Sequence, residues 1–220
     1  LDTSRGLGDV YKRQFQKLIE TVSIELNSST DNPLIFPTPE NPGSHEVVSQ
    51  GNFHAEVLAL VADAMSLGLF ELSSISERRI DQMLDPDRRA LRPFLAENPG
   101  LESGLMIVQY VAAASLGELR GHANPRTAFS TTTSAGQEDH VSMGATASWN
   151  LLEAIHRCRE VLACEAFVAH RAIQLIEKPS STCVESLIRC MNNVVLPGIA
   201  DRNTSCLLYT SDAADDLIGV

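Results

Sequence analysis

The 220-residue chain lacks the features that mark several large classes of protein. It shows no basic face, and its 17 Lys and Arg residues are outnumbered by 28 Asp and Glu residues, which gives a formal net charge of -11. We therefore expect no nucleic-acid partner and no binding to an anionic membrane surface. Since no stretch holds eighteen or more uninterrupted apolar residues, the sequence also predicts no membrane-spanning segment.

Motifs for metal, phosphate and serine chemistry are missing as well. The cysteines form no C-x-x-C pair and the six histidines no H-x-x-x-H pair, so no metal site is expected. Neither a glycine-rich phosphate loop nor a G-x-S-x-G elbow occurs. The chain has five cysteines, Cys158, Cys164, Cys183, Cys190 and Cys206. Because their number is odd and two of them lie in an apolar helical pattern, we expect buried, reduced thiols in a cytoplasmic protein.

What the chain does have is apolar residues at helical spacing, without any period-2 run long enough for a sheet. Between Val57 and Leu72 the pattern is apolar nearly all round, which predicts a helix buried on most faces. The run is interrupted only by Asp63, Ser66, Gly68 and Glu71. The predicted helices cover 15–26, 52–83, 101–121, 137–176 and 183–195, with irregular connections at 27–44, 84–100 and 122–136.

These helices are too long and too apolar to hide their surface in a small monomer. The predicted fold is therefore all-α, with long antiparallel helices that form an incomplete portion of a bundle. Other sequence or neighbouring subunits would complete the bundle and cover its exposed apolar faces.

The stretch SAGQEDHVSM, residues 134–143, places four polar side chains in a row at the predicted start of the longest helix. One interpretation is a capping box of Ser134 and Gln137, followed by Glu138 and Asp139 in the first turn, where the helix dipole favours anions. This leaves His140 unexplained. A carboxylate at a buried helix start can equally act as a general base or bind an amine, so both interpretations stay open.

Two further motifs allow a structural and a functional interpretation. In SQGNFHAE (49–56), Asn52 can cap a helix while Phe53 packs, or Asn52, Phe53 and His54 can line a pocket at the end of a buried helix. In ISERR (75–79), Glu77 beside two arginines predicts a solvated or inter-subunit salt bridge. Spacing alone does not decide the first case.

Five motifs occur in a fixed order: NSSTDNPLIF, SQGNFHAE, SSISERRIDQMLDP, NPGLESGLMIVQY and SAGQEDHVSMG. Together they resemble the aromatic amino acid ammonia-lyases, and their histidine branch in particular. The resemblance implies a cytoplasmic, all-helical homotetramer with a central bundle, acting as a carbon–nitrogen lyase in histidine catabolism. Its small-molecule substrate would be L-histidine, which loses ammonia to give trans-urocanate. The alternatives are a tyrosine or phenylalanine ammonia-lyase or aminomutase, and a catalytically silent helical assembly bundle.

The resemblance also implies a cofactor and site residues. The family uses 4-methylidene-imidazol-5-one (MIO), formed autocatalytically from an internal Ala-Ser-Gly, which this sequence does not contain; its Ser134-Ala135-Gly136 has a different order. By resemblance, Glu138 is the catalytic carboxylate that faces the substrate, and Phe53 lies near the cofactor and the substrate ring. The remaining candidates that line the site are Asn52, His54 and Gln137. Without the tripeptide, we expect the 220-residue chain alone to be inactive.

The two ends match nothing in the family pattern. LDTSRGLGDVYKRQ and CLLYTSDAADDLIGV both look like translated sequencing-adaptor sequence. The expected division is therefore a non-native segment at 1–14, a helical lyase fragment at 15–205 and a non-native tail at 206–220.

Overall fold

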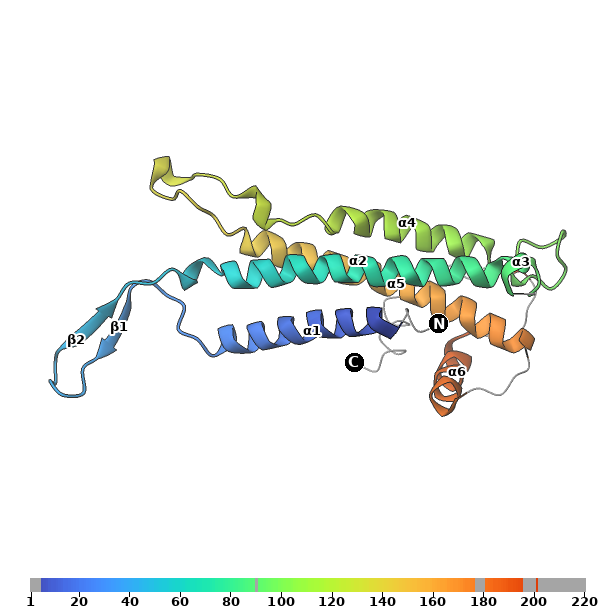
Figure 1. Cartoon of the computed structure of the whole chain (residues 1–220), viewed down its shortest axis with the longest axis horizontal. Helices are drawn as coiled ribbons and strands as arrows, with labels where there is room; N and C mark the ends of the chain where they lie inside the picture. The colour runs from blue at the N-terminus through green and yellow to red at the C-terminus, as the bar shows by residue number, and fades with distance from the viewer. Residues whose placement is uncertain (1–4, 90, 177–180, 196–200, 202–220) are drawn as a thin grey trace. The chain divides into compact units, whose positions relative to one another are not determined.

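The computed structural model describes residues 5–89, 91–176, 181–195 and 201. Its helices are α1 (Arg5–Leu26), α2 (Glu56–Leu84), α3 (Pro86–Arg89), α4 (Met106–His122), α5 (Gly144–Ile176) and α6 (Thr182–Val194) (Figure 1). Four short 3-10 turns are η1 (Asn52–His54), η2 (Pro93–Leu95), η3 (Thr127–Phe129) and η4 (Ser134–Gly136). The all-α prediction is confirmed.

The predicted connection 27–44 is not entirely irregular. It contains β1 (Leu34–Pro37), which pairs antiparallel with β2 (His45–Val48), and Leu34 lies opposite Val48. Each strand is four residues long. A run this short gives no detectable period-2 signal, which is why the helix-based analysis missed the hairpin.

The ends of the predicted helices differ from the observed ends where the backbone turns left-handed. Ala55 has φ 56° and separates η1 from α2, and Met143 has φ 57° and delays the start of α5 to Gly144. A helix cannot continue through a residue in that region. The first helix begins at Arg5, inside the segment 1–14 for which a non-native origin is predicted, and the tail 206–220 lies outside the described residues. The predicted division of the chain stays a prediction.

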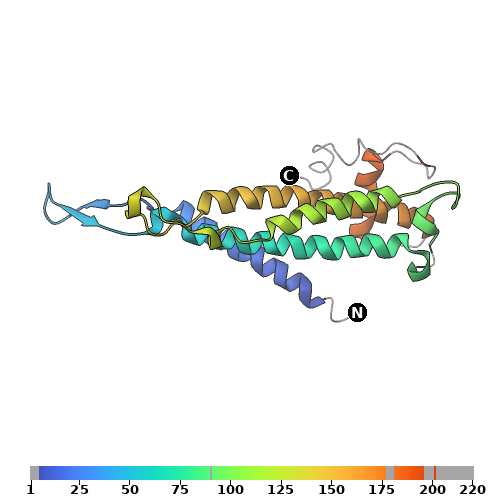
Figure 2. The ribbon, with the colours of Figure 1, turned by 90° about the horizontal axis from the view of Figure 1, so that it is seen from above.

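The chain divides into two compact units. Unit 1 comprises 1–69 and 122–154, and unit 2 comprises 70–121 and 155–220, so that α2 and α5 contribute residues to both. Within unit 2, α4 runs beside the unit 2 parts of α2 and α5 (Figures 1 and 2). These helices and α6 bury one apolar cluster, formed by Ile80, Leu84, Leu95, Leu105, Val108, Ala112, Cys164, Phe167, Val168, Ala172, Met191 and Val195.

Two predictions for unit 2 need correction. Glu77 is neither solvated nor free for another subunit, because it is 3% exposed and accepts a hydrogen bond from Arg78 Nε at 2.6 Å. That hydrogen bond and the charge of Glu77 raise the pKa of Arg78. Among the cysteines, Cys158 and Cys164 are buried as predicted, but Cys183 and Cys190 are exposed on α6, and Cys206 lies outside the described residues.

Unit 1 buries fewer apolar side chains among its described residues, namely Ala59, Ala62, Met65, Leu69, Ala147 and Ala154. Ala59, Ala62 and Ala147 form one cluster, with Leu151 packed against it. The prediction that 57–72 is buried on most faces is confirmed, because its exposed residues, Leu60 at 52% and Leu67 at 47% among them, form a single stripe along one face of the helix. Large apolar side chains on α5 are exposed as well, with Trp149 at 66%.

The segment Asn52–Leu84, which comprises η1 and α2, is also long and apolar enough, by length and composition alone, to cross a membrane. The prediction of no such segment counted only uninterrupted apolar runs. The core helix of a soluble protein passes the same test, and this one is partly buried by the chain itself.

Candidate active site

The structure places Gln137 and Glu138 in a loop between α4 and α5, not at the start of a helix. The predicted capping box is wrong, because Ser134 has φ 53° inside η4, this turn has no side-chain cap, and α5 begins only at Gly144. The helix dipole therefore provides no support for the Glu138 carboxylate. Both candidate side chains are exposed.

This loop is closed on itself by backbone and side-chain hydrogen bonds. Thr133 N donates to Glu138 O at 2.9 Å, and Glu138 N donates back to Thr133 O at 3.3 Å. Further out, Val141 N donates to Ser130 Oγ at 3.0 Å, and the same hydroxyl contacts His140 Nδ1 at 3.1 Å. In the part of the chain that the structure describes, the Glu138 carboxylate itself has no hydrogen-bond or ion-pair partner. The backbone of Glu138 is thus fixed while its charge stays available to a ligand.

The end of the loop is anchored on η1, which carries the other candidates. Ser142 is buried, and its hydroxyl donates to the backbone carbonyl of His54 while accepting from Gly144 N at 3.2 Å. Nearby, His140 Nε2 lies 3.1 Å from Glu56 Oε2 at the start of α2. The two motifs that sequence analysis singled out are therefore joined in unit 1, through the backbone of His54 and not through its imidazole.

Within η1, the side chain of Asn52 does not act as a helix cap. Its Nδ2 donates to Glu25 Oε2 on α1 at 2.8 Å, while Gly51 occupies the cap position of η1 and makes no side-chain cap bond. The Phe53 ring lies against the His54 ring, with centroids 4.1 Å apart, and is 45% exposed. Glu25 thus holds the turn that presents Phe53.

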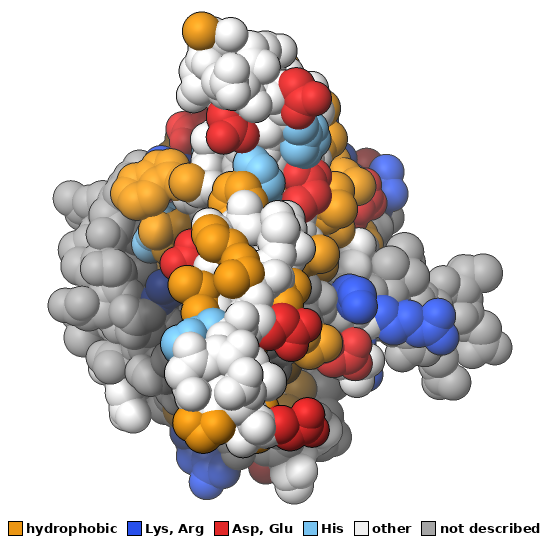
Figure 3. Space-filling view, turned by 90° about the vertical axis from the view of Figure 1, so that its left-hand side faces the viewer, with side chains coloured by type: hydrophobic (Ala, Val, Ile, Leu, Met, Phe, Trp, Pro, Cys, Tyr) orange, Lys and Arg blue, Asp and Glu red, His pale blue; other side chains and the backbone are white. Residues whose placement is uncertain are grey.

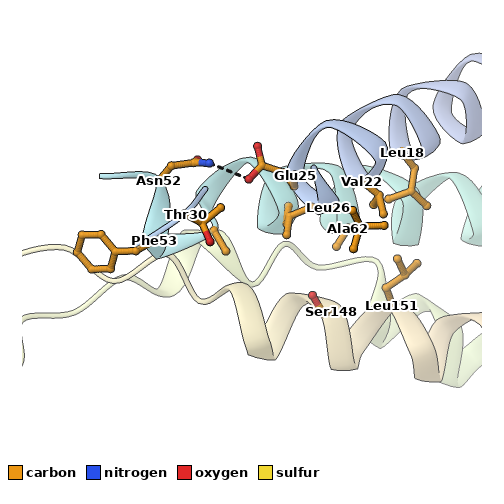
Figure 4. Close-up of a pocket in the computed structure, with 12 residues that line it drawn as sticks. Leu18, Val22, Glu25, Leu26, Thr30, Asn52, Phe53, Ala62, Ser148 and Leu151 are labelled. Carbon is orange, nitrogen blue, oxygen red and sulfur yellow. Dashed lines mark hydrogen bonds between the residues drawn. The ribbon is translucent and has the colours of Figure 1, made fainter. Parts of the chain in front are cut away.

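A cavity of about 350 Å³ lies beside η1 in unit 1. In Figure 4, Asn52 points toward Glu25, whereas the Phe53 ring points away from the apolar side chains that form the opposite end. Asn52 and Phe53 are among its lining residues, but His54, Gln137 and Glu138 are not. The remaining lining residues are Leu18, Val22, Glu25, Leu26, Thr30, Ala55, Leu58, Ala62, Ser148 and Leu151.

The space-filling view in Figure 3 shows acidic and histidine side chains set among apolar ones on one face of the molecule. Over the described ranges, no group of three or more His, Cys, Asp or Glu side chains has an arrangement that could hold a metal ion. The candidate residues of this chain therefore offer carboxylate, amide and aromatic groups to a ligand.

Sequence analysis missed the buried polar residues that hold the site in place. Asp63, 7% exposed, accepts from Thr127 N at 2.9 Å and Thr127 Oγ1 at 2.8 Å through its Oδ2 atom. Asn150, 4% exposed, accepts from Arg126 Nη2 at 2.6 Å and donates to His122 O at 2.7 Å. For Asp63, the available signal was a charged residue within an apolar helical run, because such a residue must find a partner when it is buried.

Comparison with known proteins places these features in a family. A family model described as aromatic amino acid lyase matches residues 7–194. The histidine ammonia-lyase of Bacillus mycoides (strain KBAB4) is 44% identical over 155 residues, which cover 70% of this chain and 30% of the relative. The chain thus spans about a third of the length of the curated relatives it matches.

Solved structures of a histidine ammonia-lyase and of a tyrosine aminomutase resemble this chain as well. The histidine ammonia-lyase of Trypanosoma cruzi is 33% identical with a TM-score of 0.83, covering 96% of this chain and 40% of that one. A tyrosine aminomutase of Streptomyces globisporus is 26% identical with a TM-score of 0.88, covering 96% of this chain and 39% of that one.

Proposed function

Because the chain belongs to the aromatic amino acid lyase family, we propose that it forms part of a carbon–nitrogen lyase that eliminates ammonia from L-histidine to give trans-urocanate. The 44% identity to a protein named histidine ammonia-lyase supports this substrate, as does the sequence QEDH at 137–140. The observation that carries the proposal is the hydrogen bond from Ser142 to the His54 carbonyl. It joins the loop of Glu138 to the turn of Phe53 within one unit.

The roles proposed for these residues follow from their chemistry. An amino acid substrate brings a cationic amine and a ring, and histidine adds a second polar group in its imidazole. The unpaired Glu138 carboxylate can accept a charge-assisted hydrogen bond from the amine or the imidazole, or take up a proton. The exposed face of Phe53 can pack against the substrate ring. Asn52, His54 and Gln137 would shape the surroundings of these two groups.

The cofactor that the family implies does not fit the residues of this chain. MIO supplies an electrophile to the substrate, but its precursor Ala-Ser-Gly does not occur here. The nearest tripeptide, Ser134-Ala135-Gly136, has another order and lies in the exposed turn η4, with both Ser134 and Ala135 left-handed. We therefore assign no step through MIO to these residues. The purified 220-residue chain should form no urocanate from histidine, and urocanate formation by this chain would contradict the proposal.

The same proposal includes assembly as a homotetramer in the cytoplasm. Exposed Leu60, Leu67 and Trp149 in unit 1 support assembly, because apolar side chains of this size are usually covered in a working protein. The free, reduced thiols of Cys158 and Cys164 agree with a cytoplasmic location.

A second candidate is a tyrosine or phenylalanine ammonia-lyase or aminomutase. The structural likeness to a tyrosine aminomutase favours it, and the fold is shared by both reaction classes. Ring recognition decides between the candidates, and Phe53 alone is compatible with all three rings.

A chimera would test the assignment. Residues 27–176 of this chain would replace the matching segment of the Bacillus mycoides relative, and histidine, tyrosine and phenylalanine would be compared as substrates. We expect urocanate from histidine and little turnover of the other two. A preference for tyrosine or phenylalanine would support the second candidate. If the chimera assembles like its parent but turns over none of the three, the silent assembly bundle becomes the better account.

A further inference from the structure

We propose that Asp63 is a positioning residue for Glu138, acting through Thr127 and the closed loop 130–141. The proposal rests on the proposed function only in the role that it gives Glu138. Asp63 itself lies on α2, outside both segments that the sequence motifs identify, and its hydrogen bonds come from Thr127.

The surroundings of Asp63 make a packing role alone an unsatisfactory explanation. Its side chain is 7% exposed, and Ala59 and Ala62, which precede it on α2, are fully or almost fully buried. Burying a carboxylate is costly unless hydrogen bonds compensate for the lost water. Asp63 Oδ2 receives two such bonds, both from Thr127, whereas Oδ1 is buried with no partner among the described residues. All of the hydrogen bonding recorded for this carboxylate is directed at one residue.

Thr127 controls the beginning of the loop. It is the first residue of η3, and Ser130, three residues later, is where the loop closes through the hydrogen bond from Val141 N. Three residues of chain reach at most about 10 Å. Fixing the backbone N–H and the hydroxyl of Thr127 therefore fixes the place from which the loop starts.

The other end of the loop is held close to the same part of α2. Ser142 donates to the carbonyl of His54, two residues before α2 begins, and Asp63 lies seven residues after Glu56 on that helix. Seven residues of α-helix rise about 10 Å. The loop is thus held at one end by α2 and at the other by η1, which directly precedes α2, and the Thr133–Glu138 hydrogen bonds transmit this placement to Glu138.

Hydrogen exchange of the full 220-residue chain tests the proposal without requiring turnover. In Asp63→Ala, amides in 127–141 should exchange about tenfold to a hundredfold faster, as expected for loss of hydrogen bonds to a charged group. Amides in 155–176, which belong to unit 2, should not change. In Asp63→Asn, the amide oxygen can still accept from Thr127, so most of the protection should return.

Two further variants separate positioning from a general loss of structure. Asp139→Asn, a neighbour of Glu138 that is exposed, serves as the matched control and should leave exchange in 127–141 unchanged. Thr127→Val removes the hydroxyl donor and keeps the N–H, so its effect should be smaller than that of Asp63→Ala and should largely vanish when Asp63 is already Ala. The proposal is overturned if Asp63→Ala loosens all of unit 1 equally, or loosens the loop no more than Asp139→Asn does.

In the chimera described above, Asp63→Ala should lower kcat for histidine about tenfold, and Asp63→Asn should restore most of it. If Asp63 acts through Glu138, Asp63→Ala should have no further effect on kcat in a Glu138→Gln background. Additive effects of the two substitutions would contradict the positioning role. An inactive chimera with the expected exchange pattern would count against the proposed function alone, and a working chimera without that pattern would count against Asp63 alone.

Discussion

The two units of this chain achieve order by different means. Unit 2 buries one larger apolar cluster, which joins side chains of α2, α4, α5 and α6 with Leu95, Leu105 and Val195. Among its described residues, unit 1 buries only Ala59, Ala62, Met65, Leu69, Ala147 and Ala154 as apolar side chains. It also depends on separate polar contacts, in which Asp63, Asn150, Ser142 and Glu25 each hold a backbone segment or a side chain. The candidate site therefore lies in the unit that has the smaller apolar core among its described residues.

This difference suits a site that is completed by other protein. Burial of apolar surface is the main source of stability, and unit 2 obtains it from its own helices. In unit 1, side chains such as Leu60, Leu67 and Trp149 are exposed in this chain, and their burial in an assembly would add the missing stability. We therefore expect unit 1 to respond to changes in its polar contacts and unit 2 to changes in its core.

The largest effect is expected in the core of unit 2. Leu84 is 2% exposed in the main cluster, so Leu84→Ala should lower the free energy of unfolding by about 2–5 kcal/mol. Leu60→Ala in unit 1 is the matched control and should change it by less than about 1 kcal/mol. Urea denaturation followed by circular dichroism measures both, and equal losses would remove the distinction between the units.

A smaller effect is expected from the polar network of unit 1. Replacing the buried Asn150 by Ala leaves the His122 carbonyl and the Arg126 guanidinium without this partner, at a cost of about 1–3 kcal/mol. Hydrogen exchange should show the loss in 122–127. Asn193→Ala on the exposed side of α6 serves as the control, and an equal effect of the two variants would argue against the network.

The buried thiol of Cys164 makes the free energy of unfolding depend on pH, with a loss of about 1 kcal/mol at pH 10 relative to neutral pH. Burial, and then the charge of Glu160, raise the pKa of Cys164 from 9.0 to about 12. The folded state therefore keeps its proton while the unfolded chain loses it, so stability is constant below about pH 9 and falls as the pH rises toward about 12. Comparing Cys164→Ser with the parent chain by urea denaturation isolates this effect, since serine does not titrate there. An identical alkaline slope in both would contradict it.

The smallest effect is expected at the surface of unit 1. The His140–Glu56 contact is 3.1 Å long, and the side chain of His140 is 58% and that of Glu56 38% exposed. Glu56→Gln should therefore cost less than about 1 kcal/mol, and the difference should shrink at high salt. Exchange in 138–142 at low and high ionic strength measures it. A loss as large as that of Asn150→Ala would show that this exposed pair is a principal anchor of the loop.

The spacing of apolar residues predicted helix bounds well where a local side-chain cap fixes the helix terminus. The helix predicted at 183–195 is observed as Thr182–Val194, with the Ser181 hydroxyl accepting from Val184 N. The same spacing predicted the wrong bound where a tertiary contact fixes the start of a helix. Gly104, with φ 56°, packs so closely against the Phe94 carbonyl that a Cβ would not fit, and α4 begins at Met106 instead of residue 101. Nothing in the local spacing of apolar residues reveals such a contact.

In the candidate site, too, local sequence predicted some features and tertiary contacts determine the others. The motifs identified Phe53 and Glu138, and their segments are joined in the structure, but the local conformation of Glu138 was predicted wrongly because Met143 is left-handed. The contacts of Glu25 and Asn150 were not predicted, since an acidic side chain on one helix and an amide side chain on another helix each have many possible partners. Only the fold determines which partner each one meets.

The measurement that tests the central claim most directly is urocanate formation by the chimera with and without the Glu138 carboxylate. Glu138→Gln should lower kcat for histidine about a hundredfold or more, as for loss of a general base or an ionic substrate contact. Asp139→Asn, one residue away and also exposed, should leave kcat unchanged. Equal kcat values for the parent chimera and Glu138→Gln would show that Glu138 is only a loop residue and would contradict the account.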